Sequence, residues 1–248
     1  VPERLRQALC RGSALAAVLW IGAAGFWWIG SCVHLPAGDQ AYIYGGASYF
    51  MEGDYSFLDV GGYCHMYPYQ LGLTALCELL FRIVGPYNYR AFQMVCLVLA
   101  AGSAYLGYRI LSEMTRSMAA ILGYNLLMLG CLPLILYTPW VYGDIPGIFF
   151  ALLAEWMLLR YEKAGKRRYL AVLIFALVFA VLVRNTSLIL LVAAGLTALL
   201  HALLHRDWRI LLALTLAALF SVGSCEAIYK MYEVRSGYEH SDGIPFIA

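Results

Sequence analysis

Two carboxylates and one guanidinium stand at the ends of apolar segments, where a polar side chain can meet a membrane-bound ligand. Asp39 follows the first apolar segment, Asp144 opens another within Tyr142-Gly143-Asp144, and Arg184 closes a third. Arginine is the natural bidentate partner of a phosphate, and a carboxylate can take the proton of an attacking hydroxyl. If they share one face, these side chains suit a reaction between a lipid phosphate and a hydroxyl. Asp39 is then the candidate catalytic residue, and Asp144 and Arg184 are candidate substrate-binding residues.

Residues 34–81 form a long stretch that is rich in Asp, Glu and Tyr and contains no Lys or Arg. A membrane-protein loop this poor in basic residues is typical of the side away from the cytoplasm. It is also longer than a plain connection needs to be. Within it, Tyr67 and Tyr69 are candidate substrate-binding residues, because tyrosines can stack on sugar rings. An aromatic belt at the membrane interface would explain the same tyrosines.

The composition indicates an integral membrane protein. Hydrophobic residues make up 62% of the chain and charged residues 13%, with a mean hydropathy of +0.72, whereas soluble domains have about 25% charged residues. The net charge is +2 and no basic patch suggests a nucleic-acid partner. The seven cysteines have no CxxC or other metal-ligand spacing, so the sequence predicts no metal site, although a divalent metal stays open as a cofactor.

Apolar runs long enough to cross a hydrocarbon core as helices recur along the chain. The run 68–84 is short for a span and carries Glu78 and Arg82, which are costly at the midplane, so we predict a helix lying in the interface. The predicted class is all-α: one membrane domain over 1–248, with seven transmembrane helices and this interfacial helix in an outer loop, 34–89. The predicted spans are 13–33, 90–111, 117–137, 144–161, 168–184, 186–204 and 209–229.

The Lys and Arg residues fix the predicted orientation, because short loops rich in them face the cytoplasm. If 68–84 is not a span, only five of the 17 basic residues fall on the outer side, namely Arg82, Arg90, Arg184, Lys230 and Arg235. We therefore predict a multi-pass protein with a cytoplasmic N-terminus and an active site on the extracytoplasmic face. The apolar run that begins at residue 245 predicts that the chain is a fragment of a longer protein.

On these features the chain resembles the GT-C superfamily of polyprenyl-phosphate-sugar glycosyltransferases, most closely the branch of protein O-mannosyltransferases and lipid A aminoarabinose transferases. The resemblance rests on Asp39 at the start of the first outer loop, juxtamembrane helices in that loop, a Tyr67-Pro68 segment before a helix ending at Phe81 to Gly85, and seven spans. It implies a lipid-linked sugar donor, an inverting transfer and Asp39 as general base. The acceptor would be a glycan, a lipid or a protein, in contact with membrane lipids.

The same resemblance has one departure. The family often has Asp-Glu where this chain has Asp39-Gln40, so a second carboxylate is missing there and metal binding is left open.

Other interpretations of the same residues stay open. Asp39 could be a solvated loop residue, Asp144 could cap the helix that contains Pro146, and Arg184 could reach from a helix end to the interface. The alternative function is a polytopic transporter or lipid flippase, although such proteins tend to show internal repeats and midplane polar groups. A non-catalytic membrane scaffold would explain the long loop but not Asp144 and Arg184 on the same side.

Overall fold

The computed structural model describes residues 2–32, 34–239, 241 and 243, and over these residues the chain is helical with no strand. The predicted all-α class is thereby confirmed for this part of the chain. The apolar run at 245–248 lies outside the described residues. The α-helices are α1 (Glu3–Ser31), α2 (Asp39–Glu52), α3 (Tyr63–Met66), α4 (Leu71–Val84), α5 (Tyr89–Met114), α6 (Met118–Leu129), α7 (Leu132–Leu136), α8 (Asp144–Ala164), α9 (Arg167–Val183), α10 (Leu188–His205) and α11 (Arg209–Ser236), with 3-10 turns at Ser56–Leu58, Pro68–Gln70 and Asn185–Ser187.

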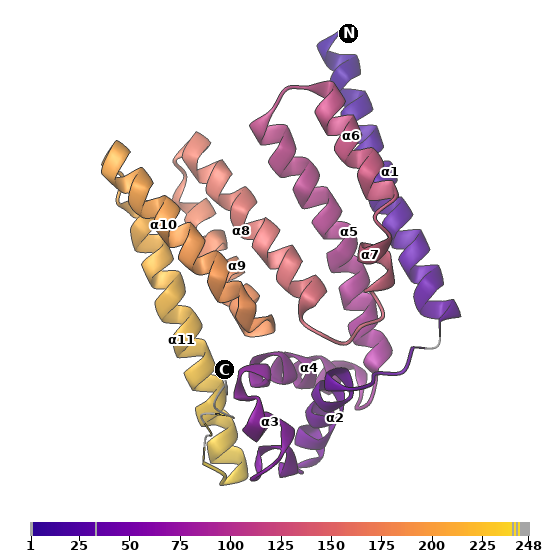
Figure 1. Cartoon of the computed structure of the whole chain (residues 1–248), viewed down its shortest axis with the longest axis vertical. Helices are drawn as coiled ribbons and strands as arrows, with labels where there is room; N and C mark the ends of the chain where they lie inside the picture. Colours follow the sequence, from indigo (N-terminus) through magenta and orange to yellow (C-terminus); the bar gives the residue numbers. More distant parts are fainter. Residues whose placement is uncertain (1, 33, 240, 242, 244–248) are drawn as a thin grey trace, which may run out of the picture.

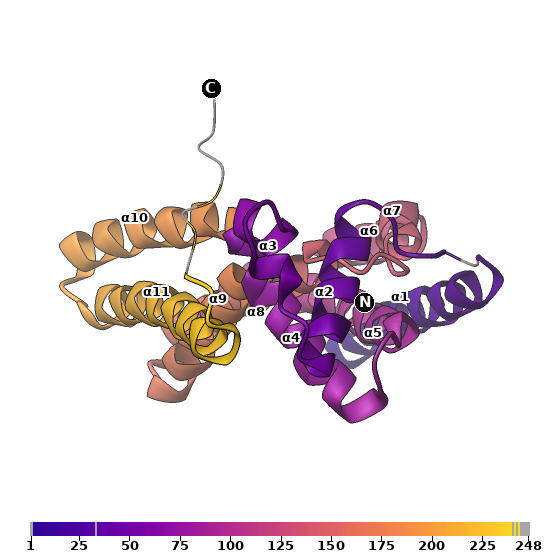
Figure 2. The same ribbon diagram turned by 90° about the horizontal axis from the view of Figure 1, so that it is seen from below.

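The longer helices run up and down between two ends of an elongated bundle (Figure 1). α1 packs on α5 and α6, α5 on α8, α8 on α9, and α9 on α11, which also contacts α10. Seen from below, α1, α5 and α6 form one side and α10 and α11 the other (Figure 2). The N-terminus and the α5–α6, α8–α9 and α10–α11 connections lie at one end, and α2, α3 and α4 lie across the other (Figure 1).

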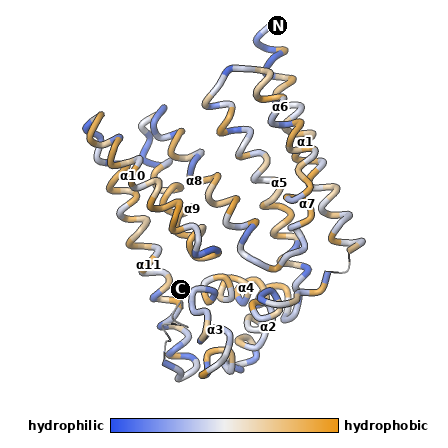
Figure 3. The backbone as a smooth tube through the Cα atoms, viewed as in Figure 1, coloured by the Kyte–Doolittle hydropathy of each residue, from blue (hydrophilic) through white to orange (hydrophobic). Residues whose placement is uncertain are grey.

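Four of the described helices are long and apolar enough to cross a membrane, namely Glu3–Ser31, Tyr89–Met114, Asn185–Leu204 and Arg209–Ser236. Their apolar residues lie along the middle of the bundle, with hydrophilic residues concentrated near the helix ends (Figure 3). These four helices fall on four of the predicted spans. They support a multi-pass membrane protein.

The other three predicted spans fall short by length or composition. α9 has 17 residues, and α8 has 21 but includes Asp144, Glu155 and Arg160. The predicted span 117–137 is interrupted, because α6 ends at Leu129 and α7 begins at Leu132. Pro133 explains the break, since it lacks an N–H and its ring clashes with the carbonyl four residues earlier. A charged residue inside a predicted span is expected to face other helices, but Glu155 is exposed on α8.

The segment between α1 and α5 is mostly structured. Where the sequence predicts one helix over 68–84, the chain has the Pro68–Gln70 turn followed by α4, which lies across the end of the bundle (Figure 1). α2, implied only by the family resemblance, begins at Asp39 and packs against α4. The segment between α1 and α5, predicted as an outer loop, is therefore a small helical layer rather than an extended connection.

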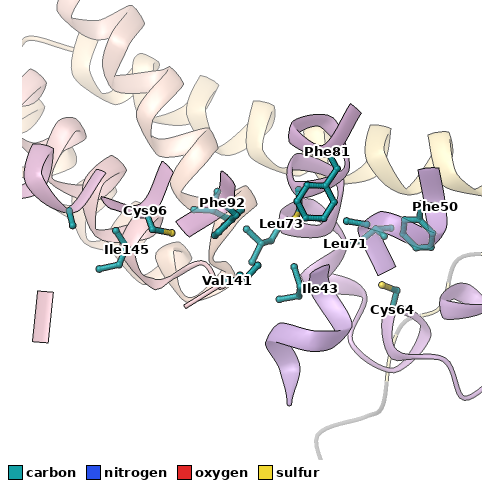
Figure 4. Packing of buried hydrophobic residues seen from close by; sticks show 14 of the residues in the cluster. Ile43, Phe50, Cys64, Leu71, Leu73, Phe81, Phe92, Cys96, Val141 and Ile145 are labelled. Carbon is teal, nitrogen blue, oxygen red and sulfur yellow. The ribbon is translucent and has the colours of Figure 1, made fainter. Parts of the chain in front are cut away.

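A hydrophobic core joins this layer to the bundle. Ile43 and Phe50 of α2 and Leu73 and Phe81 of α4 are almost fully buried with Val141, which precedes α8. Figure 4 shows Val141 lying between the α2–α4 layer and the residues Phe92, Cys96 and Ile145 of the bundle. The core thus fixes the start of α8 against α2 and α4.

A buried carboxylate ties α11 to the same layer. Glu78 of α4 is 3% exposed, and Arg235 of α11 donates to both of its oxygens, at 2.8 and 3.2 Å. Tyr232 donates to it as well, and Arg82 binds it at 2.5 Å. Arg235 also donates to the carbonyl of Phe50 in α2, at 3.2 Å. Glu78 and Arg82, which argue against a span at this position, are both directed to protein partners.

Candidate functional site

The site begins where the start of α8 meets the end of α9. A Cβ atom on Gly143 would lie 1.9 Å from the carbonyl oxygen of Val183, and one on Gly147 would lie 3.2 Å from the Cβ of Arg184. Glycine at 143 therefore permits a backbone approach that another residue would block. This approach places Arg184, the residue directly after α9, beside Asp144, the first residue of α8. Their side chains form an ion pair at 3.0 Å, with about a third of each exposed.

Tyr142 connects this ion pair to the α2–α4 layer. The Arg184 guanidinium lies over the Tyr142 ring, 4.8 Å from its centre. The Tyr142 hydroxyl donates to Asp39 Oδ2 at 3.5 Å and accepts from Gln70 Nε2 at 2.6 Å. One tyrosine thus contacts groups from α2, from the turn before α4 and from α9.

Asp39 lies in the first turn of α2, with its side chain exposed to solvent. A negative charge is favourable there because the backbone N–H groups of the first turn point towards it. Its neighbour Gln40 is buried and its Oε1 accepts from the backbone N–H of Val141 at 3.1 Å. The start of α2 is therefore held against the connection that carries Tyr142, which fixes the place of Asp39.

Aromatic rings line the approach to Asp39. Tyr67 lies 5.1 Å from Tyr63 and 6.0 Å from Tyr69 between ring centres, and Tyr63 stacks on Tyr42 at 4.7 Å. Tyr42 and Tyr69 are exposed. These rings present flat apolar faces and hydroxyl groups near the carboxylate.

Burial and the charged groups of the site shift the pKa values of three tyrosines. Burial raises the pKa of Tyr142, and the negative charge of Asp39 raises it further, while Arg184 opposes both. Burial likewise raises the pKa of Tyr69, with smaller upward contributions from Tyr67 and Asp39 and a downward one from Arg184. The pKa of Tyr63 is raised by burial first and by Asp39 next. All three tyrosines are neutral near pH 7 and can act as hydrogen-bond donors.

An apolar groove leads from Asp144 along the bundle. Its volume is about 630 Å³, and residues of α5, α6, α7 and α8 line it, among them Ala104, Met128, Leu134 and Ile148. Asp144 is the carboxylate among its lining residues. Arg184 does not line the groove, but it forms an ion pair with Asp144, which does. Asp39 does not line the groove either, and it contacts the site through the hydrogen bond from Tyr142. The site therefore joins a polar end to a long apolar surface.

The structure brings together the side chains singled out from the sequence. Asp39, Asp144 and Arg184 all border Tyr142 or its direct partners, and Tyr67 and Tyr69 belong to the adjoining aromatic cluster. Asp144 makes no capping hydrogen bond, since the cap position is Gly143 and its carboxylate binds Arg184 instead.

The sequence alone did not identify Tyr142, Gln70 or Gln40 as site residues, although they hold the site together. Tyr142 stands in the segment Tyr142-Gly143-Asp144, Gln70 follows Tyr69, and Gln40 follows Asp39. Their positions next to candidate residues were the available signal.

Within the described residues, no three or more His, Cys, Asp or Glu side chains gather as a metal-ion site would require. The arrangement offers one guanidinium and two carboxylates, from different elements, at the end of an apolar groove. Such a site can hold an amphiphilic anion and accept a proton beside it. No protein-family model, curated protein or solved structure matches this chain.

Proposed function

We propose that this protein is an integral membrane glycosyltransferase that moves a sugar from a polyprenyl-phosphate donor to an acceptor hydroxyl. The observation that carries the proposal is the gathering of Asp39, Asp144 and Arg184 around Tyr142 at the end of an apolar groove. A soluble substrate would leave the groove empty, whereas a lipid-linked phosphate would occupy both the polar end and the apolar groove. The resemblance to the GT-C superfamily is part of the same proposal.

In the proposed orientation all seven predicted spans cross the membrane and α4 lies flat at its outer surface. Arg4, Arg6, Arg11, Arg116 and Lys166 then lie at the cytoplasmic end, together with the α10–α11 connection. The α2–α4 layer lies at the extracytoplasmic end with the site. The alternation of helix directions in Figure 1 supports this arrangement, because it places the basic connections together.

The donor binds with its phosphate at Arg184, its polyprenyl chain in the groove and its sugar against Tyr67 and Tyr69. The ion pair with Asp144 is made through Nη2 of the guanidinium. Arginine has five N–H donors in a planar fork, so the remaining donors can bind phosphate oxygens. Asp144 keeps the guanidinium in place and orients the acceptor.

In the transfer step, the acceptor oxygen attacks the anomeric carbon from the face opposite the phosphate. A new carbon–oxygen bond forms as the bond to the phosphate oxygen breaks, so the configuration inverts. Asp39 takes the proton of the attacking hydroxyl. The electron pair of the broken bond remains on the phosphate, where Arg184 stabilises the growing charge, an effect of about 3 kcal/mol once the bound donor excludes water from the site.

The direct test is transfer of a labelled sugar from a polyprenyl-phosphate donor by the full-length protein in lipid vesicles. Asp39→Asn removes the base and should lower turnover by about 10²–10⁴-fold, with unchanged binding of the donor. Asp54→Asn is the matched control: Asp54 is an exposed carboxylate of the same loop that accepts from Ser56 N–H at 2.8 Å, a turn role that Asn also fills. Wild-type transfer by Asp39→Asn would remove Asp39 from this role.

The orientation has a separate test that does not depend on activity. Single cysteines placed beside Asp54 and beside Asp144, in a chain without its native cysteines, should react with a membrane-impermeant reagent added from the extracytoplasmic side. A cysteine beside Lys166 should react only after the membrane is opened. The reverse pattern would overturn the proposed orientation and the placement of the site with it.

A further inference from the structure

A second cavity lies at the opposite end of the bundle from Asp39. Its volume is about 620 Å³, and it is bordered by the first turns of α1, the last turns of α5 and the start of α6. Four arginines line it, namely Arg6, Arg11, Arg109 and Arg116, with Glu113 as an acidic residue at its edge. The proposed transfer reaction uses none of these side chains.

The acidic residues around this cavity are already engaged. Glu113 binds Arg160 at 3.1 Å and Lys163 at 2.9 Å, on the side of α8. Glu3 binds Arg6 at 2.5 Å. For Arg11, Arg109 and Arg116, no carboxylate of the described residues lies within ion-pair distance. The cavity therefore holds an excess of positive charge that the described part of the chain does not neutralise.

Internal contacts hold two of these arginines in place. Arg6 Nη1 donates to the backbone carbonyl of Arg116 at 2.5 Å, which joins the start of α1 to the α5–α6 connection. Arg109 donates to the Tyr105 hydroxyl at 2.9 Å and lies over the ring of Trp156, 4.7 Å from its centre. Because Arg6 and Arg109 are held in this way, they lose less conformational entropy on facing an anion than free surface side chains do.

One part of the lining is apolar. Leu15 and Val18 of α1 continue the cavity away from the arginines, with Ile121 of α6 beside them. Leu15 is 58% exposed, so this part of the cavity opens to the surroundings of the bundle. An inorganic anion would contact the arginines and leave this surface bare. A phosphate that carries acyl chains would cover both.

We propose that this cavity binds the phosphate headgroup of an anionic phospholipid from the cytoplasmic leaflet. Guanidinium groups bind phosphate oxygens in pairs, and basic pockets between transmembrane helices on the cytoplasmic side suit such headgroups. Arg11 and Arg116 bind the phosphate, and the acyl chains lie along Leu15 and Val18. The inference rests on the membrane orientation but not on sugar transfer, so either can fail without the other.

Native mass spectrometry of the whole chain, released from nanodiscs of phosphatidylcholine doped with phosphatidylglycerol, tests the proposal. Wild-type protein should retain phosphatidylglycerol in preference to phosphatidylcholine. The double variant Arg11→Gln/Arg116→Gln should bind phosphatidylglycerol about 100-fold more weakly, because two charge-assisted hydrogen-bonding groups are lost. Circular dichroism spectra that match the wild type would establish that the variant is folded.

The control is Arg4→Gln/Arg167→Gln, which removes two exposed arginines from the same end of the bundle, outside the cavity. It should bind phosphatidylglycerol as the wild type does. An equal loss in both double variants would mean general charge attraction and would overturn the proposal. It would also be overturned if millimolar inorganic phosphate protected the wild type against heat as well as phosphatidylglycerol does.

Discussion

Replacing Glu78 by Gln tests whether the buried ion cluster holds the α2–α4 layer on α11. Glu78 Oε1 accepts from Arg235 Nη2 at 2.8 Å and from Arg82 Nη2 at 2.5 Å. Its Oε2 accepts from Tyr232 and from Arg235 Nη1. A glutamine amide has one acceptor oxygen, so in either orientation its NH2 group faces donors of arginine. The substitution therefore removes hydrogen bonds and also sets donor against donor.

The size of the effect follows from burial. Removing one partner of a fully buried ion pair costs about 3–5 kcal/mol, and one hydrogen bond to a charged group contributes about 1.5–3 kcal/mol. The Glu78 side chain is 4% exposed, but that of Arg235 is 26% and that of Arg82 is 49% exposed. Water can therefore solvate the arginines in part, and we expect Glu78→Gln to lower the free energy of unfolding by about 2–4 kcal/mol.

Denaturant unfolding of the purified protein in detergent micelles measures this difference. The control is Glu52→Gln in α2, because Glu52 is exposed and its contact with the Tyr87 hydroxyl is long, at 3.4 Å. A surface substitution of this kind changes the stability by about 0.5 kcal/mol or less. If Glu78→Gln changed the stability no more than Glu52→Gln, the cluster would not be what holds α4 to α11.

The same carboxylate predicts a pH dependence. Burial acts to raise the pKa of Glu78, but hydrogen bonds from Arg235, Tyr232 and Arg82 outweigh it and hold the pKa below the ordinary value of 4.5. Between the two values the unfolded chain binds more protons than the folded one, so stability rises with pH. The contribution of Glu78 should be complete above pH 4.5 and disappear as the pH falls through the lower folded-state value. Wild type and Glu78→Gln should therefore converge in stability in acid, and a constant gap down to pH 2 would refute the assignment.

Two further substitutions test how the site is held. Gly143→Ala places a methyl group against the Val183 carbonyl and should lower the free energy of unfolding by about 2 kcal/mol or more. The control is Gly123→Ala, where the added Cβ has no atom within 4 Å, and it should be neutral or stabilising by up to about 1 kcal/mol. Equal effects of the two substitutions would contradict the close approach at Gly143. Tyr142→Phe leaves the buried amide of Gln70 without its acceptor and should cost about 1–3 kcal/mol. The double variant with Gln70→Met should recover part of that loss in the same unfolding assay, and no recovery would show that the two side chains act separately.

The helices were largely predictable from the sequence because apolar runs and their charged ends repeat along the chain. The described α5 and α9 follow the predicted runs 90–111 and 168–184 closely, whereas α11 begins with the predicted run 209–229 but continues to Ser236. The hydropathy of 117–137 is continuous, so it masks the break that Pro133 makes between α6 and α7. A proline inside an apolar run was the signal for that break.

Side-chain partners in the site were harder to predict, since they depend on how distant elements pack. Asp39 and Tyr142 are far apart in the chain and meet only because Val141 is buried against α2 and α4. The sequence placed both near the outer ends of helices. The sequence did not show that Asp144 forms an ion pair, because an Asp at this position could equally well have capped the helix.

The long distance between Asp39 and Tyr142 shows what keeps the site assembled. Their oxygens are 3.5 Å apart, at the limit of a hydrogen bond, so this contact contributes little by itself. Two shorter hydrogen bonds hold the neighbouring residues, one from Val141 N–H to Gln40 at 3.1 Å and one from Gln70 to Tyr142 at 2.6 Å. These two buried amides join the α2–α4 layer to the connection before α8, and they leave the Asp39 carboxylate exposed for a substrate. The position of the candidate base is therefore set by its neighbours, while its own oxygens remain available to accept a proton.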